Sequence, residues 1–437
     1  MTMHPVRWLH EELPKLVQGG VLDSASADRL KQHYGPPPAS PWKTGAMVLI
    51  GTLGSMLLGG GIILLFAHNW EMLSRPTRAA LAFALLIVAQ LFAGFALLKK
   101  PDSAAWTEGA AVFLSGAVVA SIALIAQTYQ IVWEIDQILL AWVLLMAPLI
   151  YALRSRITAA LVWVGSTWWL FARMEIRDDL VYGLAYLALA ALAVPFMVQQ
   201  FRTHRDEGRT LLLNWTAGLA LTLGAIRVGV ESGDPWRLVL SGLFALLYLF
   251  GVYREMDGGS GAWWRAPFRS IGAIGLMVLL FLFTFREMWS DDKSVAGDSA
   301  ILTVLLIGIA LCALALFGCY HLIRDQRYQQ AALLLTPLLA LIGLLMDRFT
   351  NTPSIMAVLA NLSVLAAGLT LCIYGFQHHK LGTVNGGLVL LLAVFLARFM
   401  DIDLTFLVRG VAFIIVGAGF LAVNGWLYQR SRKEVAS

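Results

Sequence analysis

Long apolar stretches, each about 20 residues in length, follow one another along almost the whole chain. A helix needs roughly 17–25 mostly apolar residues to cross the hydrocarbon core of a bilayer. In that core a helix satisfies its own backbone hydrogen bonds. The sequence therefore predicts an all-α, polytopic integral membrane protein with about 14 transmembrane helices. The expected segments are 44–67, 78–98, 105–126, 137–153, 157–172, 180–198, 211–230, 237–252, 270–287, 300–319, 329–346, 355–376, 382–398 and 405–427.

The composition agrees with this fold class and excludes others. Apolar residues make up 59% of the chain and charged residues 14%, and the mean hydropathy is +0.74. Soluble domains contain about 45–50% apolar and about 25% charged residues. A soluble enzyme, a disordered chain and a disulfide-rich secreted module are therefore excluded. Cys312, Cys319 and Cys372 lie in apolar runs, so neither a disulfide framework nor a metal site is predicted.

Two short polar segments flank the apolar bundle, which spans residues 44–427. Residues 1–43 are predicted to be a cytoplasmic region that ends in a stiff Pro-rich linker, Gly35–Pro38. Residues 428–437 form a short tail. The connections between apolar segments are also short, the longest being 253–269, so no inserted soluble domain is expected.

The N-terminal region is expected to hold two short helices within Val6–Tyr34. Gly19-Gly20 separates them, and Asp23 or Ser24 can cap the second helix. Leu9, Leu13, Leu16 and Val17 form a narrow apolar stripe on the first helix. This stripe leaves two interpretations open: a helical pair packed on the cytoplasmic face of the bundle, or a docking site for a protein partner.

The distribution of charge predicts how the chain is oriented. With the N-terminus in the cytoplasm, 21 of the 32 Lys and Arg residues lie on the inner side and 11 on the outer side. The same assignment places 12 of the 27 acidic residues inside and 15 outside. An excess of Lys and Arg on the cytoplasmic side is typical of membrane proteins. The sequence thus predicts a multi-pass protein with both termini in the cytoplasm.

A polar residue recurs at the outer end of each outgoing helix. Successive positions are 46 to 62 residues apart, the length of one helical hairpin, which predicts about seven degenerate hairpins. Five of the seven ends carry Arg, and an acidic residue usually lies nearby. The residues at these ends are His68, Asn69, Gln127, Arg173, Arg227, Arg286, Arg348 and Arg398.

Two explanations of these residues remain open. A cation is favoured at the C-terminal end of a helix, and a long Arg side chain can reach the interface, so each Arg can be purely structural. Alternatively, several ends converge on an outward-facing vestibule that binds an anionic lipid or glycan, because Arg suits phosphate and carboxylate groups.

The densest polar cluster is at the last outer loop, where Asp401 and Asp403 follow Arg398 and precede Arg409. Arg409 lies inside the final apolar segment, where an unpaired charge is costly, so it is expected to pair with one of these aspartates. The Asp-x-Asp pattern is also compatible with a metal-bound sugar or phosphate donor. Pairing and ligand binding both remain open.

No catalytic residue is predicted. The chain contains no His-Glu-x-x-His pattern, no Walker loop and no Gly-x-Ser-x-Gly nucleophile elbow. No acidic or basic residue falls near the centre of an expected span, although ion-coupled carriers usually need one. We therefore expect no metal, no cofactor and no nucleic-acid partner. The sequence leaves enzymatic activity undecided and favours a protein that is not an enzyme.

Two regions resemble a known family. The first region consists of Leu16–Leu22 with Tyr34, then the first apolar span, which ends in Phe66–Glu71 with its Asn69-Trp70 pair. This region is similar to bacterial predicted membrane proteins of the family with domain of unknown function 2157. The stretch Arg398–Asn424, with Arg409-Gly410 and Phe413, is also similar to the end of long members. The resemblance implies a bacterial inner-membrane location. It brings no established activity.

Three functions are compatible with these features. The first is a transporter, flippase or export component that handles an anionic envelope lipid or glycan at its periplasmic face. The second is a non-enzymatic scaffold or regulatory subunit that works with a membrane or periplasmic protein. The third is a membrane-embedded glycosyl- or phosphotransferase that uses Asp401 and Asp403. Membrane lipids are expected partners in each case.

Overall fold

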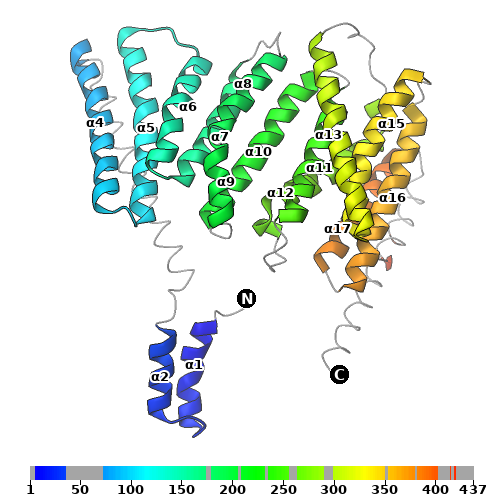
Figure 1. Cartoon of the computed structure of the whole chain (residues 1–437), viewed down its shortest axis with the longest axis horizontal. Coiled ribbons are helices and arrows are strands. Elements are labelled where there is room, and N and C mark those ends of the chain that lie inside the picture. The colour runs from blue at the N-terminus through cyan, green and yellow to red at the C-terminus, as the bar shows by residue number, and fades with distance from the viewer. Residues whose placement is uncertain are drawn as a thin grey trace. The chain divides into compact units, whose positions relative to one another are not determined.

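The computed structural model describes residues 5–35, 72–173, 179–204, 208–231, 235–254, 263–289, 299–349, 353–378 and 381–401, with residues 414, 418 and 419 in addition. Every regular element in these residues is a helix (Figure 1), as the sequence predicts. The chain divides into two compact units, Met1–Leu81 and Ala82–Ser437. Each unit is described separately.

The first unit contains a helical hairpin made of α1 (Pro5–Gln18) and α2 (Ser24–Tyr34). The chain reverses at Gly19-Gly20, where the backbone amides of Val21 and Leu22 both donate to the carbonyl of Leu16. Gly20 has a φ of +68°, a conformation that glycine adopts without strain. The predicted helical pair and its glycine break are therefore confirmed.

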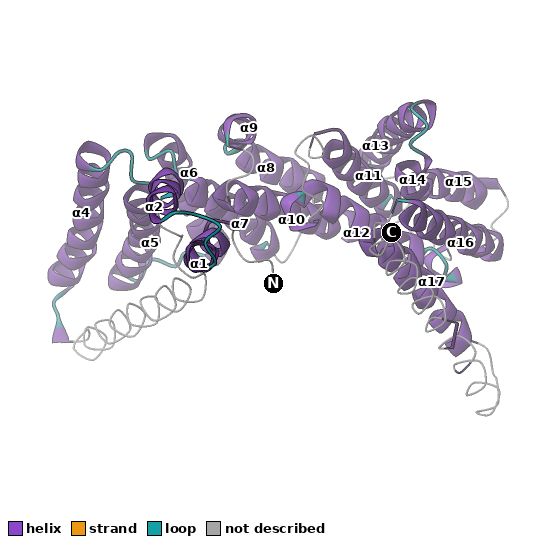
Figure 2. Ribbon diagram, turned by 90° about the horizontal axis from the view of Figure 1, so that it is seen from below, coloured by secondary structure: helices purple, strands orange, loops and turns teal. Residues whose placement is uncertain are grey.

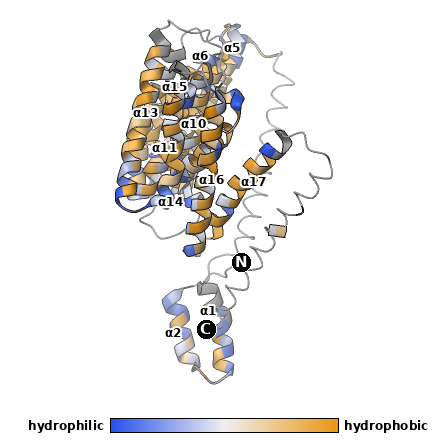
Figure 3. Cartoon of the chain, turned by 90° about the vertical axis from the view of Figure 1, so that its right-hand side faces the viewer, coloured by the Kyte–Doolittle hydropathy of each residue, from blue (hydrophilic) through white to orange (hydrophobic). Residues whose placement is uncertain are grey.

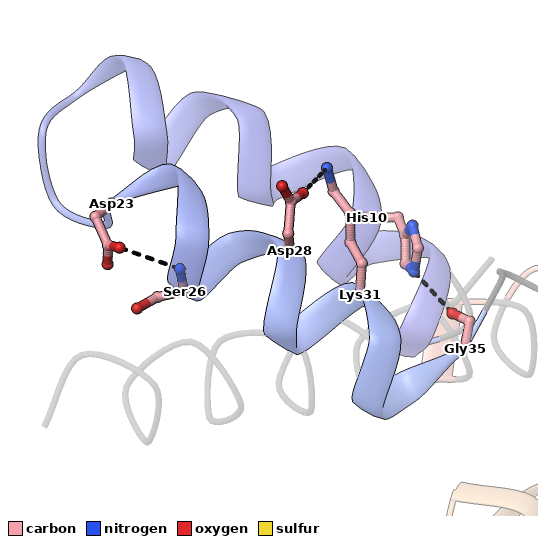
Figure 4. Close-up of polar contacts among 6 residues, drawn as sticks. All are labelled: His10, Asp23, Ser26, Asp28, Lys31 and Gly35. Atoms are coloured by element: carbon pink, nitrogen blue, oxygen red, sulfur yellow. Dashed lines mark hydrogen bonds and ion pairs between the residues drawn. The ribbon is translucent and has the colours of Figure 1, made fainter.

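Local polar contacts fix the two ends of this hairpin (Figure 4). At the turn, Asp23 caps α2, because its Oδ2 accepts from the backbone N–H of Ser26 at 3.2 Å. At the open end, a ring nitrogen of His10 lies 2.9 Å from the carbonyl oxygen of Gly35. Leu13 of α1 is fully buried in the chain. Of the two predicted caps, Asp23 is the one that is used.

The second unit is a set of apolar helices that run alternately up and down in Figure 1. Most of α4 (Arg75–Lys99) belongs to it. The remaining helices are α5 (Ala104–Tyr129), α6 (Ile135–Ala152), α7 (Arg156–Ala172), α8 (Asp179–Ala191), α9 (Val194–Thr203), α10 (Gly208–Glu231), α11 (Trp236–Arg254), α12 (Pro267–Leu282), α13 (Ser299–Arg324), α14 (Tyr328–Ala331), α15 (Leu335–Phe349), α16 (Pro353–Gln377) and α17 (Leu381–Asp401).

Among the described residues, nine helices are long and apolar enough to cross a membrane, and the bent pair α8–α9 would make ten. Hydrophobic residues cover these helices, while hydrophilic residues gather towards their ends (Figure 3). This finding supports a multi-pass membrane protein. The expected segments 44–67 and 405–427 fall almost entirely outside the described residues, so the number 14 remains a prediction.

Two expected helices are wrong in detail, and a proline explains the first. The segment 180–198 is broken between α8 and α9, which are bent by 45°. Pro195 lies directly after the break and has no N–H to donate to the preceding turn. The carbonyl of Leu192, inside the break, accepts a hydrogen bond from the hydroxyl of Tyr151 at 2.6 Å.

The expected segment 270–287 also ends early. The α-helix α12 stops at Leu282, and the chain continues as the short 3₁₀ helix η4 (Arg286–Trp289). Side chains capture the carbonyls that a longer helix would use: Thr284 donates to Phe281 at 2.6 Å and the Trp289 indole donates to Phe283 at 2.7 Å. Local capture of this kind competes with helix extension.

Helices of the second unit pack closely where glycine faces a neighbouring backbone. A methyl group added to Gly272 of α12 would lie 2.6 Å from the carbonyl oxygen of Phe244 in α11. Small residues that admit such contact are typical of helix interfaces in membranes. The helices also pack across the sequence order, since α7 contacts α10 and α11 contacts α13 (Figure 2).

Candidate anion site at the upper edge

The upper edge is defined here as the end of the second unit, uppermost in Figure 1, where α5, α7, α10 and α15 end and where α6, α11 and α16 begin. Several predicted site residues lie on this edge, since the helix ends that carry them alternate as expected. His68, Asn69, Asp403 and Arg409 lie outside the described residues. Arg348 and Asp401 lie in the last turns of α15 and α17, and their side chains are not described.

Arg173 anchors the first polar cluster. It follows the last residue of α7, and its Nε lies 2.9 Å from Oδ2 of Asp136 in the first turn of α6. The Asp136 side chain is only 5% exposed, while that of Arg173 is 38% exposed. A buried carboxylate therefore holds one side of a guanidinium group that remains accessible on the other.

Arg227 of α10 joins the same cluster. Its Nη2 donates to the backbone carbonyl of Arg173 at 3.3 Å. The guanidinium carbon of Arg173 also lies 4.9 Å from the centre of the Tyr182 ring on α8, which is a cation–π contact. Four helices thus place two arginines, one aspartate and one tyrosine at one point of the upper edge.

Arg398 forms a second cluster with the end of α12. Its Nη2 donates to the carbonyl of Thr284 at 2.6 Å and to the Thr284 hydroxyl at 3.1 Å. Its guanidinium carbon lies 4.9 Å from the ring centre of Phe285. The side-chain amide of Asn361 donates to the same Thr284 carbonyl at 3.3 Å. Arg398 and Asn361 therefore both donate to one backbone carbonyl, that of Thr284, just after the end of α12.

The remaining predicted residues stay apart in the described structure. Gln127 is exposed near the end of α5, and Arg286 is exposed at the start of η4. The described residues therefore group the predicted positions into two clusters, Arg173 with Arg227 and Arg398 with Thr284. A single vestibule that unites all of the arginine ends is not observed among them.

Two buried charged residues at the starts of helices on the upper edge were not predicted from the sequence. Asp136 is the buried partner of Arg173, and Arg237, 5% exposed, donates to the carbonyl of Met288 at 2.6 Å. The Arg237 guanidinium also lies over the Trp289 ring at 5.3 Å. Asp136 and Arg237 each lie in the first turn of an apolar helix. A charged residue at the start of an apolar run is the sequence feature that could have marked both as candidate site residues.

A buried carboxylate also lies at the opposite end of the unit, the lower edge, where α6 ends and α5 and α7 begin. Glu108 of α5 accepts hydrogen bonds from the Ser155 hydroxyl at 2.5 Å and from the backbone amides of Arg156 and Ile157 at 3.0 and 3.1 Å. It therefore caps the N-terminus of α7, the positive end of that helix dipole. Nothing in the spacing of these residues, nearly 50 positions apart, predicts the contact.

The described residues contain no group of three or more His, Cys, Asp or Glu side chains that could hold a metal ion. The described polar groups of the Arg173 cluster are two arginines, one buried carboxylate and one tyrosine. In chemical terms this set can bind an anion by charge and by hydrogen bonds.

Comparisons with known proteins identify one family. The family model described as predicted membrane protein (DUF2157) matches residues 14–159. This range includes α2, α4, α5 and α6, and it contains both Glu108 and the Ser155–Ile157 segment that Glu108 caps. No curated protein and no solved structure matches the chain. Residues 14–159, about a third of the chain, are therefore similar to the DUF2157 family of predicted membrane proteins.

Proposed function

We propose that this protein is a transporter or flippase-like export component that binds an anionic envelope lipid or glycan at its upper edge. The carrying observation is the cluster of Arg173 and Arg227 around the buried Asp136. Two guanidinium groups and one carboxylate meet at this point of the upper edge. The proposal needs no catalytic residue and no cofactor.

The geometry of Arg173 supports a ligand-binding role. Asp136 and Tyr182 hold its guanidinium in place, so little side-chain freedom remains to be lost when a ligand binds. A guanidinium offers five N–H donors, and the 2.9 Å contact with Asp136 involves Nε. The remaining donors can form paired hydrogen bonds to a phosphate or carboxylate of the ligand.

The membrane arrangement that goes with this function has about 14 helices in about seven hairpins, in the bacterial inner membrane, with both termini cytoplasmic. The upper edge then faces the periplasm. Support comes from the charge distribution, which places 21 of 32 basic residues on the cytoplasmic side, opposite the upper edge.

Cysteine labelling tests this orientation. Single cysteines at Gln130 and Lys100, introduced after the native cysteines are replaced, should react with an impermeant maleimide from opposite sides of the membrane.

A second candidate function is a scaffold or regulatory subunit. The α1–α2 hairpin favours it, because Val21 and Tyr34 are 72% and 53% exposed on a small folded element. A protein partner could bury these side chains. The transferase alternative rests on Asp401 and Asp403, whose side chains are not described, so no observation favours it.

Mass spectrometry of the protein purified with its native lipids tests the proposal. The wild-type protein should retain an anionic lipid or glycan, and the Arg173→Gln/Arg227→Gln variant should retain less of it per protein molecule. Arg154→Gln, at an exposed arginine of the lower edge, is the matched control and should retain the ligand. A wild-type protein that carries no anionic molecule, or a stoichiometric protein in its place, would contradict the proposal.

A further inference from the structure

A tryptophan-rich turn projects from the lower edge, away from the candidate anion site. Trp263, Trp264 and Arg265 form the 3₁₀ helix η3, which precedes α12. Trp263 is 67% exposed and Trp264 is 47% exposed, although indole side chains are usually well covered. We refer to these three residues as the Trp–Arg turn.

The turn is held firmly to the helices behind it. The indole N–H of Trp215, on α10, donates to the carbonyl of Trp264 at 2.9 Å, and its ring meets the Trp263 ring edge-on at 5.8 Å. The Ser270 hydroxyl on α12 donates to the carbonyl of Trp263 at 2.7 Å. These hydrogen bonds hold the backbone of Trp263 and Trp264 in place, with both indole rings exposed at the surface.

Cationic side chains accompany the exposed rings. Arg265 is exposed, and its guanidinium carbon lies 4.9 Å from the Trp264 ring centre. Arg254, also exposed, is the last residue of α11. The end of α11 touches the start of α12, because a methyl group on Gly251 would clash with the Arg269 backbone. Arg254, Arg265 and Arg269 therefore belong to one small region of the lower edge.

This combination matches the chemistry of a lipid headgroup region. Trp is enriched where a membrane meets water, because its ring is apolar and its N–H is polar. Clusters of Lys and Arg next to transmembrane helices attract anionic lipids. The Trp–Arg turn joins the apolar helices α11 and α12, so it lies at the level where headgroups are found.

We infer that the Trp–Arg turn, together with Arg254 and Arg269, binds the headgroup of an anionic phospholipid. The arginines contact the phosphate and the two indoles lie among the upper parts of the acyl chains. An anionic phospholipid is favoured over a free anion because the exposed indoles would otherwise contact water. This site is independent of the proposed transport function, which uses arginines at the other end of the helices.

Lipid titration of the purified full-length chain in detergent tests the inference. Phosphatidylglycerol should bind more tightly than phosphatidylcholine, with the increase in melting temperature as the readout. Each arginine near a charged lipid surface contributes about 1 kcal/mol, or about five-fold in affinity. Arg254→Gln/Arg265→Gln should therefore weaken phosphatidylglycerol binding by roughly 25-fold.

Controls separate lipid binding from misfolding and from simple anion binding. Arg154→Gln removes an exposed arginine elsewhere on the lower edge and should bind phosphatidylglycerol as the wild type does. Arg254→Lys/Arg265→Lys keeps the charge and should retain most of the affinity. Added salt should weaken lipid binding to the wild-type protein, a measurement that needs no variant.

Three results would overturn the inference. The first is equal stabilisation of the wild-type protein by phosphatidylglycerol and phosphatidylcholine. The second is unchanged phosphatidylglycerol affinity in a folded Arg254→Gln/Arg265→Gln variant. The third is full stabilisation by inorganic phosphate alone, which would assign the site to a free anion.

Discussion

Glu108 shows how one side chain can connect distant parts of this protein. Its carboxylate accepts three hydrogen bonds from the segment Ser155–Ile157 and is itself only 7% exposed. Hydrogen bonds to a charged group are worth about 1.5–3 kcal/mol each in favourable cases, more than those between neutral groups. The residue therefore fixes the start of α7 against α5.

Replacing this carboxylate by an amide should destabilise the protein. Glu108→Gln loses the charge at the helix N-terminus and turns one acceptor into a donor that faces backbone N–H groups. We expect a loss of about 1–3 kcal/mol, measured as a lower melting temperature of the purified protein. Glu134→Gln is the matched control, because Glu134 precedes α6, is exposed and makes no capping bond.

An unchanged melting temperature in Glu108→Gln, with Glu134→Gln also unchanged, would mean that the cap contributes nothing.

Asp23 gives the N-terminal hairpin a pH dependence. Its hydrogen bonds with Ser26 hold the pKa of the carboxyl below its ordinary value of 3.8. A group whose pKa is lowered by folding stabilises the folded state above its unfolded pKa, and that contribution is lost as the pH falls through the lowered value. Hydrogen exchange of the first α2 amides, corrected for intrinsic rates, should therefore accelerate below about pH 4.

The variant Asp23→Asn keeps a capping side chain but cannot titrate. Its α2 amides should show no such acceleration. Equal pH dependence in the variant and the wild type would assign the effect to another group.

At the scale of the elements, close contact between backbones determines how the helices pack. Gly272 lets α12 approach α11 until their main chains touch, and neither backbone can move aside easily. Gly272→Ala should therefore cost about 1–3 kcal/mol through overpacking. The measurement is the melting temperature of the full-length protein in detergent.

Gly94→Ala is the control for this prediction. Gly94 lies in α4 with no atom within 4 Å of the added methyl group. Alanine there should be neutral or should stabilise the helix by up to about 1 kcal/mol. Equal effects of the two substitutions would show that helix propensity, and not the close contact, determines the result.

The sequence predicts these elements well where apolar length alone defines them. The bounds of α5 and α16 lie within a few residues of the expected segments. It fails where a local competitor ends a helix, as Pro195 does between α8 and α9 and as Thr284 does after α12. A proline can be read from the sequence. A hydrogen bond from a nearby side chain to a backbone carbonyl, as Thr284 makes to Phe281, cannot be read in the same way.

The candidate site could be predicted only in part, for a similar reason. Arg173, Arg227 and Arg398 are visible as polar residues at the ends of apolar runs. Their partners depend on which helices pack together: Asp136 precedes Arg173 by a whole helix, and Thr284 is 114 residues from Arg398. Apolar periodicity defines each helix but does not determine its neighbours.

At the scale of the whole molecule, the second unit has charged side chains concentrated at the ends of its helices. The upper edge holds the Arg173–Asp136–Arg227 cluster, and the lower edge holds the Glu108 cap and the Trp–Arg turn. Such a molecule would engage anionic groups at both surfaces of a bilayer. Transport requires in addition that the ligand passes from one surface to the other.

Lipid translocation in proteoliposomes measures that step most directly. Phosphatidylglycerol labelled on its headgroup is incorporated into both leaflets, and a membrane-impermeant reductant quenches the outer leaflet. The wild-type protein should give continued loss of fluorescence as inner-leaflet lipid moves outward, and Arg154→Gln should behave in the same way. Arg173→Gln/Arg227→Gln should reduce the rate to near that of protein-free vesicles. Wild-type vesicles that retain inner-leaflet fluorescence as protein-free vesicles do would contradict the proposed lipid transport.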